Sequence, residues 1–216
     1  MTSLPRLSPG AIDSDRVGIF SLPNLITMSR LGLSLVFFVI LGLFDGKYWK
    51  YVGEPLPAGG VIILDVSIVV FILAAATDFL DGHLARKWGM LSTFGRIADP
   101  FVDKVFICGS FIFLIPITPL VPAWYVVVII TREFLVSGLR SFVESRGVAF
   151  GAGLGGKLKM LFQSVTIPFV IFYRANFFDS SALKVFVIIL LALSLILTVT
   201  SSVEYVQRAV RILRSK

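Results

Sequence analysis

Six long apolar runs constrain this chain more than any other feature. Each holds about 20 residues, the length that an α-helix needs to cross the hydrocarbon core of a bilayer. They fall at about 22–44, 60–80, 98–117, 121–143, 157–175 and 182–205. The runs are continuous, whereas strands of a membrane β-barrel alternate apolar and polar residues over about 10 positions. The sequence therefore predicts an all-α, polytopic membrane protein with six transmembrane helices.

The composition agrees with this fold class. Hydrophobic residues make up 56% of the 216 positions, and the mean hydropathy is +0.92, more than a single water-soluble core of this length would use. We therefore expect a short N-terminal tail at 1–20, a six-helix transmembrane domain at 21–207 and a basic tail at 208–216. The tail at 1–20 lacks the charged, apolar and small-residue order of a signal peptide.

Lysine and arginine are distributed unevenly among the connections. One set lies near the N-terminus, in the second and fourth connections and at the C-terminus: Arg6, Arg16, Arg30, Arg86, Lys87, Arg96, Arg140, Arg146, Lys157, Lys159, Arg208, Arg211, Arg214 and Lys216. The other three connections hold Lys47, Lys50, Arg174 and Lys184. The positive-inside rule then places both termini and the even-numbered connections in the cytoplasm. The lysines and arginines that give the net charge of +7 would then face the anionic lipids of the cytoplasmic leaflet. The charge is therefore no reason to expect nucleic-acid binding.

Two clusters of aspartates interrupt the apolar pattern. "TDFLDGHLAR" at 77–86 follows the second apolar run, and "GRIADPFVDK" at 95–104 leads into the third. If a helix continues from the second run, a rotation of about 100° per residue brings five residues of the first cluster onto one face. They are Asp78, Asp81, Gly82, Ala85 and Arg86. That face combines two carboxylates, two small residues and a guanidinium.

The second cluster makes a similar stripe. Gly95, Asp99 and Asp103 recur every four residues and therefore share one helical face. Pro100 fits if the helix starts within the preceding turn, because a proline in the first turn loses no hydrogen bond. A short connection would place the two stripes side by side, so we expect four carboxylates to converge near the membrane surface.

Four carboxylates at this position require cations, because an ionised aspartate within a span costs about 2.5–3.5 kcal/mol. Arg86 and Lys104 do not balance them. Oxygen ligands suit a hard divalent ion such as Mg²⁺, Mn²⁺ or Ca²⁺, and zinc is disfavoured because His83 is the only histidine and Cys108 the only cysteine. Two ions would clamp a pyrophosphate, and the small residues of the stripes would let a flat nucleotide approach the backbone.

The fourth apolar run carries a polar face. Arg132, Glu133, Ser137 and Arg140 fall within an arc of about 140°. Arginines within a membrane span normally face a cavity or a partner. We expect Arg132 and Arg140 to contact a substrate phosphate, for which the arginine fork is well suited, and Glu133 to hold one of them.

Two further groups would reach the same phosphate. Asn24, Thr27 and Arg30 form a polar sector at the start of the first run, and Lys157 opens the fifth. The positive-inside rule alone explains the other cationic residues expected on the cytoplasmic side, namely Arg146, Lys159, Arg208, Arg211 and Arg214.

The aspartate pattern resembles the signature of the CDP-alcohol phosphotransferase family at every position. The pattern reads Asp78-x-x-Asp81-Gly82-x-x-Ala85-Arg86, eight residues, then Gly95-x-x-x-Asp99-x-x-x-Asp103. The resemblance implies a six-helix membrane fold, usually a homodimer, with two Mg²⁺ or Mn²⁺ ions at the cytoplasmic end. Outside the signature, "LPNLITMSRLGL" and "ITREFLVSGLRSFVESRGVAFGAGLGGKLKMLFQ" are most similar to the phosphatidylglycerophosphate synthases of that family.

This resemblance implies a lipid-synthesising enzyme of the inner membrane, with its active site on the cytoplasmic side. It would transfer a phosphatidyl group from CDP-diacylglycerol to sn-glycerol 3-phosphate, giving phosphatidylglycerophosphate and CMP. Asp78, Asp81 and Asp99 would hold the ions, and Asp103 would be a further ligand or the general base. The CDP part would contact Asn24, Asp78, Gly82, Ala85, Arg86 and Gly95. The acceptor phosphate would contact Thr27, Arg30, Arg132, Arg140 and Lys157. We expect direct displacement, since one histidine and one cysteine form no nucleophile pair here.

Three alternatives remain open. The nearest alternative is an enzyme that uses the same donor with inositol phosphate, phosphatidylglycerol or serine as acceptor. Serine has no phosphate that the cationic residues could bind. A membrane prenyltransferase would show separate aspartate-rich motifs on distant helices. A cation transporter would show aspartates in the middle of a span and broken helices.

Overall fold

The computed structural model describes the backbone of residues 22–88, 93–146 and 153–214, and the side chains of residues 28–77, 101–146 and 153–212. Within these residues the chain forms six α-helices and one short 3-10 helix, with no strand. They are α1 (Leu22–Tyr48), η2 (Trp49–Tyr51), α2 (Ala58–Trp88), α3 (Thr93–Leu114), α4 (Ala123–Glu144), α5 (Leu154–Asn176) and α6 (Ser181–Arg214). The prediction of an all-α chain with six helices is confirmed.

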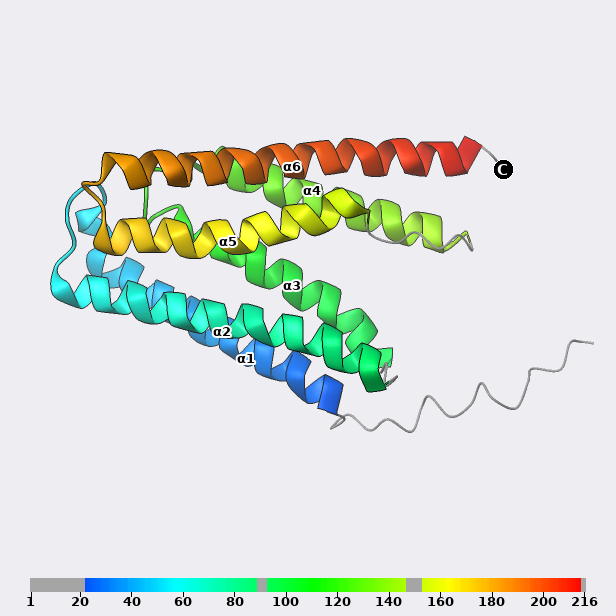
Figure 1. The fold of residues 1–216 in the computed structure, drawn as a ribbon, viewed down its shortest axis with the longest axis horizontal. Coiled ribbons are helices and arrows are strands. Elements are labelled where there is room, and N and C mark those ends of the chain that lie inside the picture. Colours follow the sequence, from blue (N-terminus) through cyan, green and yellow to red (C-terminus); the bar gives the residue numbers. More distant parts are fainter. Residues whose placement is uncertain (1–21, 89–92, 147–152, 215–216) are drawn as a thin grey trace, which may run out of the picture.

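The helices run up and down along one long axis (Figure 1). Three connections, 49–57, 115–122 and 177–180, gather at one end, which we call the hairpin end. The opposite end holds the start of α1 and the end of α6. It also holds the end of α2 with the start of α3, and the end of α4 with the start of α5. This arrangement matches the predicted alternation of the connections.

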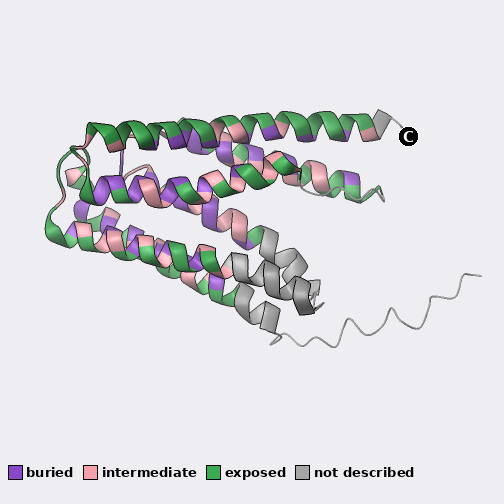
Figure 2. Ribbon diagram, viewed as in Figure 1, coloured by how far each residue is buried: buried purple, intermediate pink, exposed green. Residues whose placement is uncertain are grey.

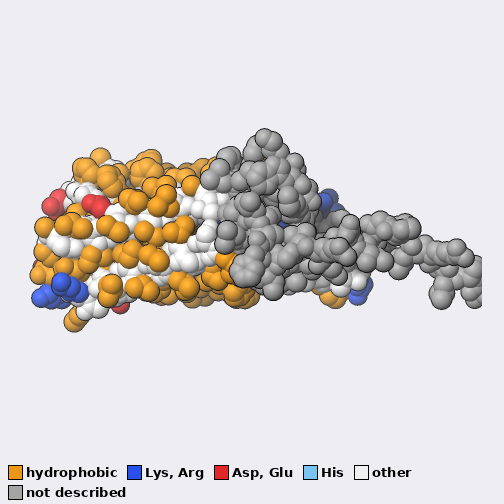
Figure 3. All heavy atoms as spheres, turned by 90° about the horizontal axis from the view of Figure 1, so that it is seen from below, with side chains coloured by type: hydrophobic (Ala, Val, Ile, Leu, Met, Phe, Trp, Pro, Cys, Tyr) orange, Lys and Arg blue, Asp and Glu red, His pale blue; other side chains and the backbone are white. Residues whose placement is uncertain are grey.

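Three of the described helices are long and apolar enough to cross a membrane by length and composition. These spans are Met28–Tyr51, Ala58–Thr77 and Ser181–Ile212. Figure 2 shows exposed residues along the outer side of α6. Figure 3 shows hydrophobic side chains over much of the described part of one flank, with charged side chains at its hairpin end. An apolar flank of this extent is suited to lipid rather than to water.

Aromatic side chains fill the space between α1, α2 and α3. Phe37, Phe71 and Phe106 are buried, and the rings of Phe71 and Phe106 stack with their centroids 4.7 Å apart. On α3, Gly109 lies so close to Phe38 of α1 that an added Cβ would be 2.5 Å from the ring. An added methyl group would force the ring to shift, so the missing side chain at Gly109 allows this close contact between α1 and α3.

One arginine joins all three connections at the hairpin end. Arg174 of α5 is 1% exposed, and its guanidinium donates hydrogen bonds to the carbonyl oxygens of Ile117 (3.1 Å) and Tyr51 (2.6 Å). It also lies 4.8 Å from the centroid of the Phe178 ring. We call this set of contacts the Arg174 clasp.

Two helix boundaries extend beyond the apolar runs. α2 continues to Trp88, as the aspartate stripe required. α3 begins at Thr93, so the expectation that Pro100 lies in its first turn is wrong: the proline is inside the helix. Apolar runs mark the part of a helix that suits lipid, whereas the helical backbone of α3 also includes Thr93, Gly95 and Arg96, which lie before the apolar run.

Candidate active site

A cavity of about 520 Å³ lies among α1, α2, α3 and α5. Its charged lining residues, within the described part of the chain, are Arg30, Asp103 and Lys157, which come from three different helices. The rest of its wall is largely apolar and consists of Phe71, Ile72, Ala74, Ala75, Ala76, Phe106, Ile107, Met160, Leu161, Ser164 and Pro168. The structure thus brings three of the predicted site residues together at one cavity.

Arg30 and Asp103 form an ion pair at this cavity. The Nη1 atom of Arg30 donates to Oδ1 of Asp103 over 2.7 Å, although the two residues are 73 positions apart. Arg30 is 2% exposed and the Asp103 side chain 29% exposed. Leaving a buried guanidinium without a partner is costly, and the Asp103 carboxylate compensates its charge here. The predicted contact of Arg30 with a phosphate stays a prediction.

The other three aspartates are placed only through their helices. Asp78 and Asp81 belong to α2 and Asp99 to α3. Their side chains lie outside the described residues, as do those of Asn24, Thr27, Gly82, Ala85, Arg86 and Gly95. Among the side chains that are described, no group of three histidines, cysteines, aspartates or glutamates is close enough to hold a metal ion. Ala75 and Ala76, in the turn before Asp78, line the same cavity as Asp103.

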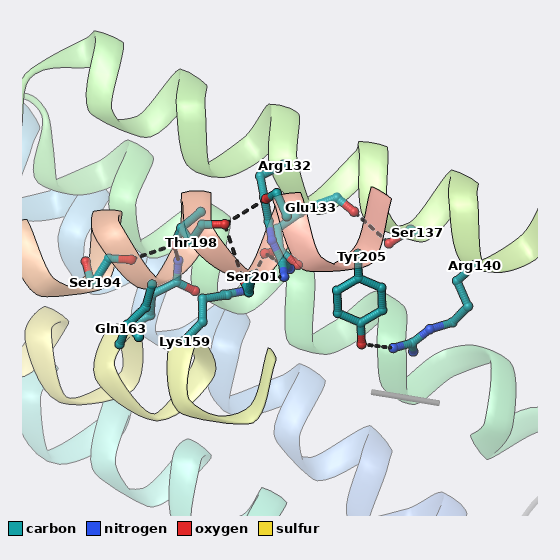
Figure 4. A network of polar contacts seen from close by, with 12 residues as sticks. Arg132, Glu133, Ser137, Arg140, Lys159, Gln163, Ser194, Thr198, Ser201 and Tyr205 are labelled. Carbon is teal, nitrogen blue, oxygen red and sulfur yellow. Dashed lines mark hydrogen bonds and ion pairs between the residues drawn. The ribbon is translucent and has the colours of Figure 1, made fainter. Parts of the chain in front are cut away.

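A second polar cluster lies between α4, α5 and α6 (Figure 4). The Glu133 carboxylate accepts hydrogen bonds from Arg132 (3.1 Å) and from Lys159, and Arg132 also donates to Ser201 of α6 (2.9 Å). The prediction that Glu133 holds an arginine is confirmed. Lys159, which topology alone would leave near the surface, is 6% exposed. We call these four residues the Glu133 cluster.

Tyr205 of α6 extends the polar contacts toward the start of α5. Its hydroxyl accepts hydrogen bonds from Arg140 (3.2 Å) and from the backbone N–H of Gly153 (3.1 Å). The guanidiniums of Arg132 and Arg140 lie 5.8 and 6.0 Å from the centroid of its ring. No sequence pattern pointed to Tyr205, because its partners lie far away along the chain.

Lys157 and Lys159 lie on different faces of α5. Two positions along a helix correspond to a rotation of about 200°, so the two side chains leave the helix on nearly opposite sides. Lys157 lines the cavity, whereas Lys159 bonds Glu133. The predicted phosphate ligands are therefore divided in this structure: Arg30 and Lys157 line the cavity, while Arg132 and Arg140 bond polar groups between α4 and α6.

Comparison with known proteins agrees with the resemblance in the sequence. Over 196 residues the chain is 38% identical to the probable phosphatidylglycerophosphate synthase of Mycobacterium tuberculosis, covering 91% of this chain and 85% of the relative. It is 34% identical over 160 residues to the CDP-diacylglycerol–glycerol-3-phosphate 3-phosphatidyltransferase of Bacillus subtilis, covering 74% and 80%. For the Haemophilus influenzae protein of the same name the identity is 29% over 198 residues, covering 88% and 94%.

The family model described as CDP-alcohol phosphatidyltransferase matches residues 20–200, a range that includes all four aspartates and the cavity. The chain therefore belongs to the CDP-alcohol phosphatidyltransferase family.

Proposed function

We propose that the protein transfers a phosphatidyl group from CDP-diacylglycerol to sn-glycerol 3-phosphate, with phosphatidylglycerophosphate and CMP as products. One observation carries the proposal. The cavity joins the carboxylate of Asp103 to an apolar wall, in a chain whose relatives in Bacillus subtilis and Haemophilus influenzae are named for this reaction.

Two hard divalent ions, Mg²⁺ or Mn²⁺, would be held by Asp78, Asp81 and Asp99, with Asp103 as a further ligand. The donor set suits such ions, because it consists of carboxylates, and the Asp103 side chain keeps 29% exposure at the cavity. Bound ions would neutralise charge on the pyrophosphate and on the departing CMP.

The donor would lie across the end of the cavity. Its CDP part would contact Asn24, Asp78, Gly82, Ala85, Arg86 and Gly95, as the sequence predicts. Its glycerol backbone and the start of an acyl chain would lie against the apolar wall formed by Ile72 and Ala75 of α2 and Leu161 of α5. Removing these apolar groups and the lipid from contact with water stabilises this arrangement.

The chemical step is a direct displacement at phosphorus. Asp103 accepts the proton of the acceptor hydroxyl, whose oxygen forms a bond to the phosphorus carried by the lipid. The bond between that phosphorus and the CMP oxygen breaks, and CMP leaves with the electron pair. Asp103 is suited to this role because its carboxylate faces the cavity and is fixed by Arg30.

The acceptor is expected to carry a phosphate. Lys157 lines the cavity, and the Glu133 cluster holds the two cations Arg132 and Lys159 against a single carboxylate. Together with Thr27 and Arg140, these groups favour an anionic acceptor over serine, which has no phosphate for them.

The setting proposed is the inner membrane, with six spans, both termini and the active site on the cytoplasmic side, and a homodimer as the assembly. The lysine and arginine distribution supports the orientation. The extended apolar flank supports insertion into a lipid bilayer (Figure 3).

The test is an assay of CMP release by the purified protein in detergent, with CDP-diacylglycerol and Mg²⁺ or Mn²⁺. Glycerol 3-phosphate, inositol phosphate, phosphatidylglycerol and serine are offered in turn, and we expect release with glycerol 3-phosphate. Release with another acceptor alone would show that glycerol 3-phosphate is not the acceptor, while leaving the family membership unchanged. Uptake of divalent ions by liposomes without any CMP release would favour a transporter.

Asp81→Asn tests the proposed ion site. We expect CMP release to fall by more than about 100-fold in excess Mg²⁺, because the ions supply several kcal/mol of charge stabilisation. Asp65→Asn is the matched control. Asp65 lies on the same helix, and its carboxylate accepts a hydrogen bond from Asn176 (2.7 Å), at the hairpin end. Undiminished release by Asp81→Asn would contradict the metal assignment.

A further inference from the structure

The Arg30–Asp103 pair is built on a rigid contact between two helices. Phe106 follows Asp103 by three residues, about one helical turn, and Phe37 follows Arg30 by seven, about two turns. Their rings meet edge to face, with centroids 5.8 Å apart. Ser34 also donates a hydrogen bond to the carbonyl oxygen of Arg30 (2.8 Å). The pair therefore has little freedom to move.

The burial of Arg30 separates it from the other cation of the cavity. Arg30 is 2% exposed and its Nη1 atom faces Oδ1 of Asp103, whereas Lys157 is exposed at the cavity. A charge-assisted hydrogen bond of 2.7 Å is at the short, strong end of the range for such pairs. A guanidinium that holds one carboxylate oxygen also fixes the direction of the second oxygen.

We propose that Arg30 is a positioning residue that orients the Asp103 carboxylate toward the acceptor hydroxyl, and not a ligand of the acceptor phosphate. This inference rests on the proposed function. A base that is misdirected by about 1 Å loses on the order of 100-fold in rate, although the substrate still binds. Arg30 thus acts on the chemical step through Asp103.

Steady-state kinetics of Arg30→Gln test the inference. We expect kcat to fall by about 100-fold, while KM for glycerol 3-phosphate changes by less than about threefold. Arg30→Lys keeps a cation beside Asp103 and is expected to recover part of the lost kcat. A raised KM with unchanged kcat would overturn the inference and assign Arg30 to the phosphate, as the sequence alone predicted.

Arg174→Gln is the matched control for the loss of a buried arginine. Arg174 is 1% exposed, as deeply buried as Arg30, but it bonds carbonyl oxygens at the hairpin end. We expect Arg174→Gln to lower the thermal midpoint and to keep the wild-type kcat per folded molecule, measured after size-exclusion chromatography. Equal losses of kcat in the two variants would give Arg30 a merely structural role and overturn the inference.

Binding of Mn²⁺ gives a readout that needs no turnover. Removing the positive charge of Arg30 beside a carboxylate favours divalent cations, so Arg30→Gln should bind Mn²⁺ at least as tightly as the wild type in a titration followed by electron paramagnetic resonance. Weaker binding would tie Arg30 to the ion site and overturn the inference. Wild-type protein that releases no CMP with any acceptor would overturn the proposed function instead.

Discussion

Glu133, Arg132 and Lys159 share one buried contact in which a single carboxylate faces two cations. Glu133 is 12% exposed, and both of its partners are more deeply buried. Breaking a buried ion pair by removing one partner costs about 3–5 kcal/mol, because the remaining charge stays buried without compensation. The contact is therefore a strong determinant of how α4, α5 and α6 pack.

Glu133→Gln is expected to lower the thermal midpoint of the protein in detergent by several degrees, since it leaves two cations side by side. The double variant Glu133→Gln with Lys159→Met removes one of those cations and should recover part of the loss. Glu144→Gln, at the exposed end of the same helix, is the control and should leave the midpoint unchanged. A midpoint for Glu133→Gln equal to that of the control would contradict a stabilising role.

At the scale of residues, the sequence predicted which side chains gather at the cavity better than it predicted which side chains contact one another. It predicted Asp103 and Lys157 as site residues, and the structure places both at one cavity; it also predicted that Glu133 holds an arginine, as Arg132 confirms. It missed the burial of Lys159 and the contacts of Tyr205, whose partner Arg140 is 65 positions away. Such contacts depend on how α4, α5 and α6 pack, which no local pattern encodes.

At the scale of elements, the contact between α1 and α3 depends on one glycine. A methyl group at Gly109 would lie 2.5 Å from the Phe38 ring, which is itself packed against Phe37, Phe106 and Phe113. The added methyl group would push the ring out of this position and disturb the contact between α1 and α3. Arg30 and Asp103 lie on these same two helices.

Gly109→Ala is therefore expected to destabilise the protein and to reduce CMP release. Gly42→Ala is a control from the same interface, where an added Cβ would lie 3.7 Å from the Phe113 ring, an ordinary contact. Alanine favours a helix by about 1 kcal/mol over glycine, so Gly42→Ala should be neutral or stabilising. Thermal unfolding of both variants measures the difference, and equal midpoints would argue against the close approach.

The apolar runs predicted the existence of all six helices but not their ends. A run of apolar residues reports the segment that suits lipid, and helical hydrogen bonding continues beyond it. α2 therefore reaches Trp88 and α6 reaches Arg214. The buried residues Ser194, Thr198, Ser201 and Tyr205 form one stripe on α6, and small or hydroxyl-bearing residues of this kind commonly join helices in membranes.

At the scale of the whole molecule, the helix ends fall into two groups that should face opposite sides of the membrane. Lys50 lies at the hairpin end and Ser145 at the opposite end, and both are exposed. In a Cys108→Ser background, a membrane-impermeant thiol reagent added to intact cells should label Lys50→Cys and leave Ser145→Cys unlabelled until the cells are opened. The reverse pattern would contradict the proposed cytoplasmic termini.

The Arg174 clasp also has a consequence for biosynthesis. Tyr51 and Ile117 leave the ribosome well before Arg174. Their carbonyl oxygens therefore receive the hydrogen bonds of Arg174 only after the fifth helix has been inserted. Phe178, which lies over the guanidinium, follows only four residues later. The Arg174 clasp therefore forms late in translation. A nascent chain that stops after its fourth helix has the α1–α2 and α3–α4 hairpins but lacks the arginine that joins their connections.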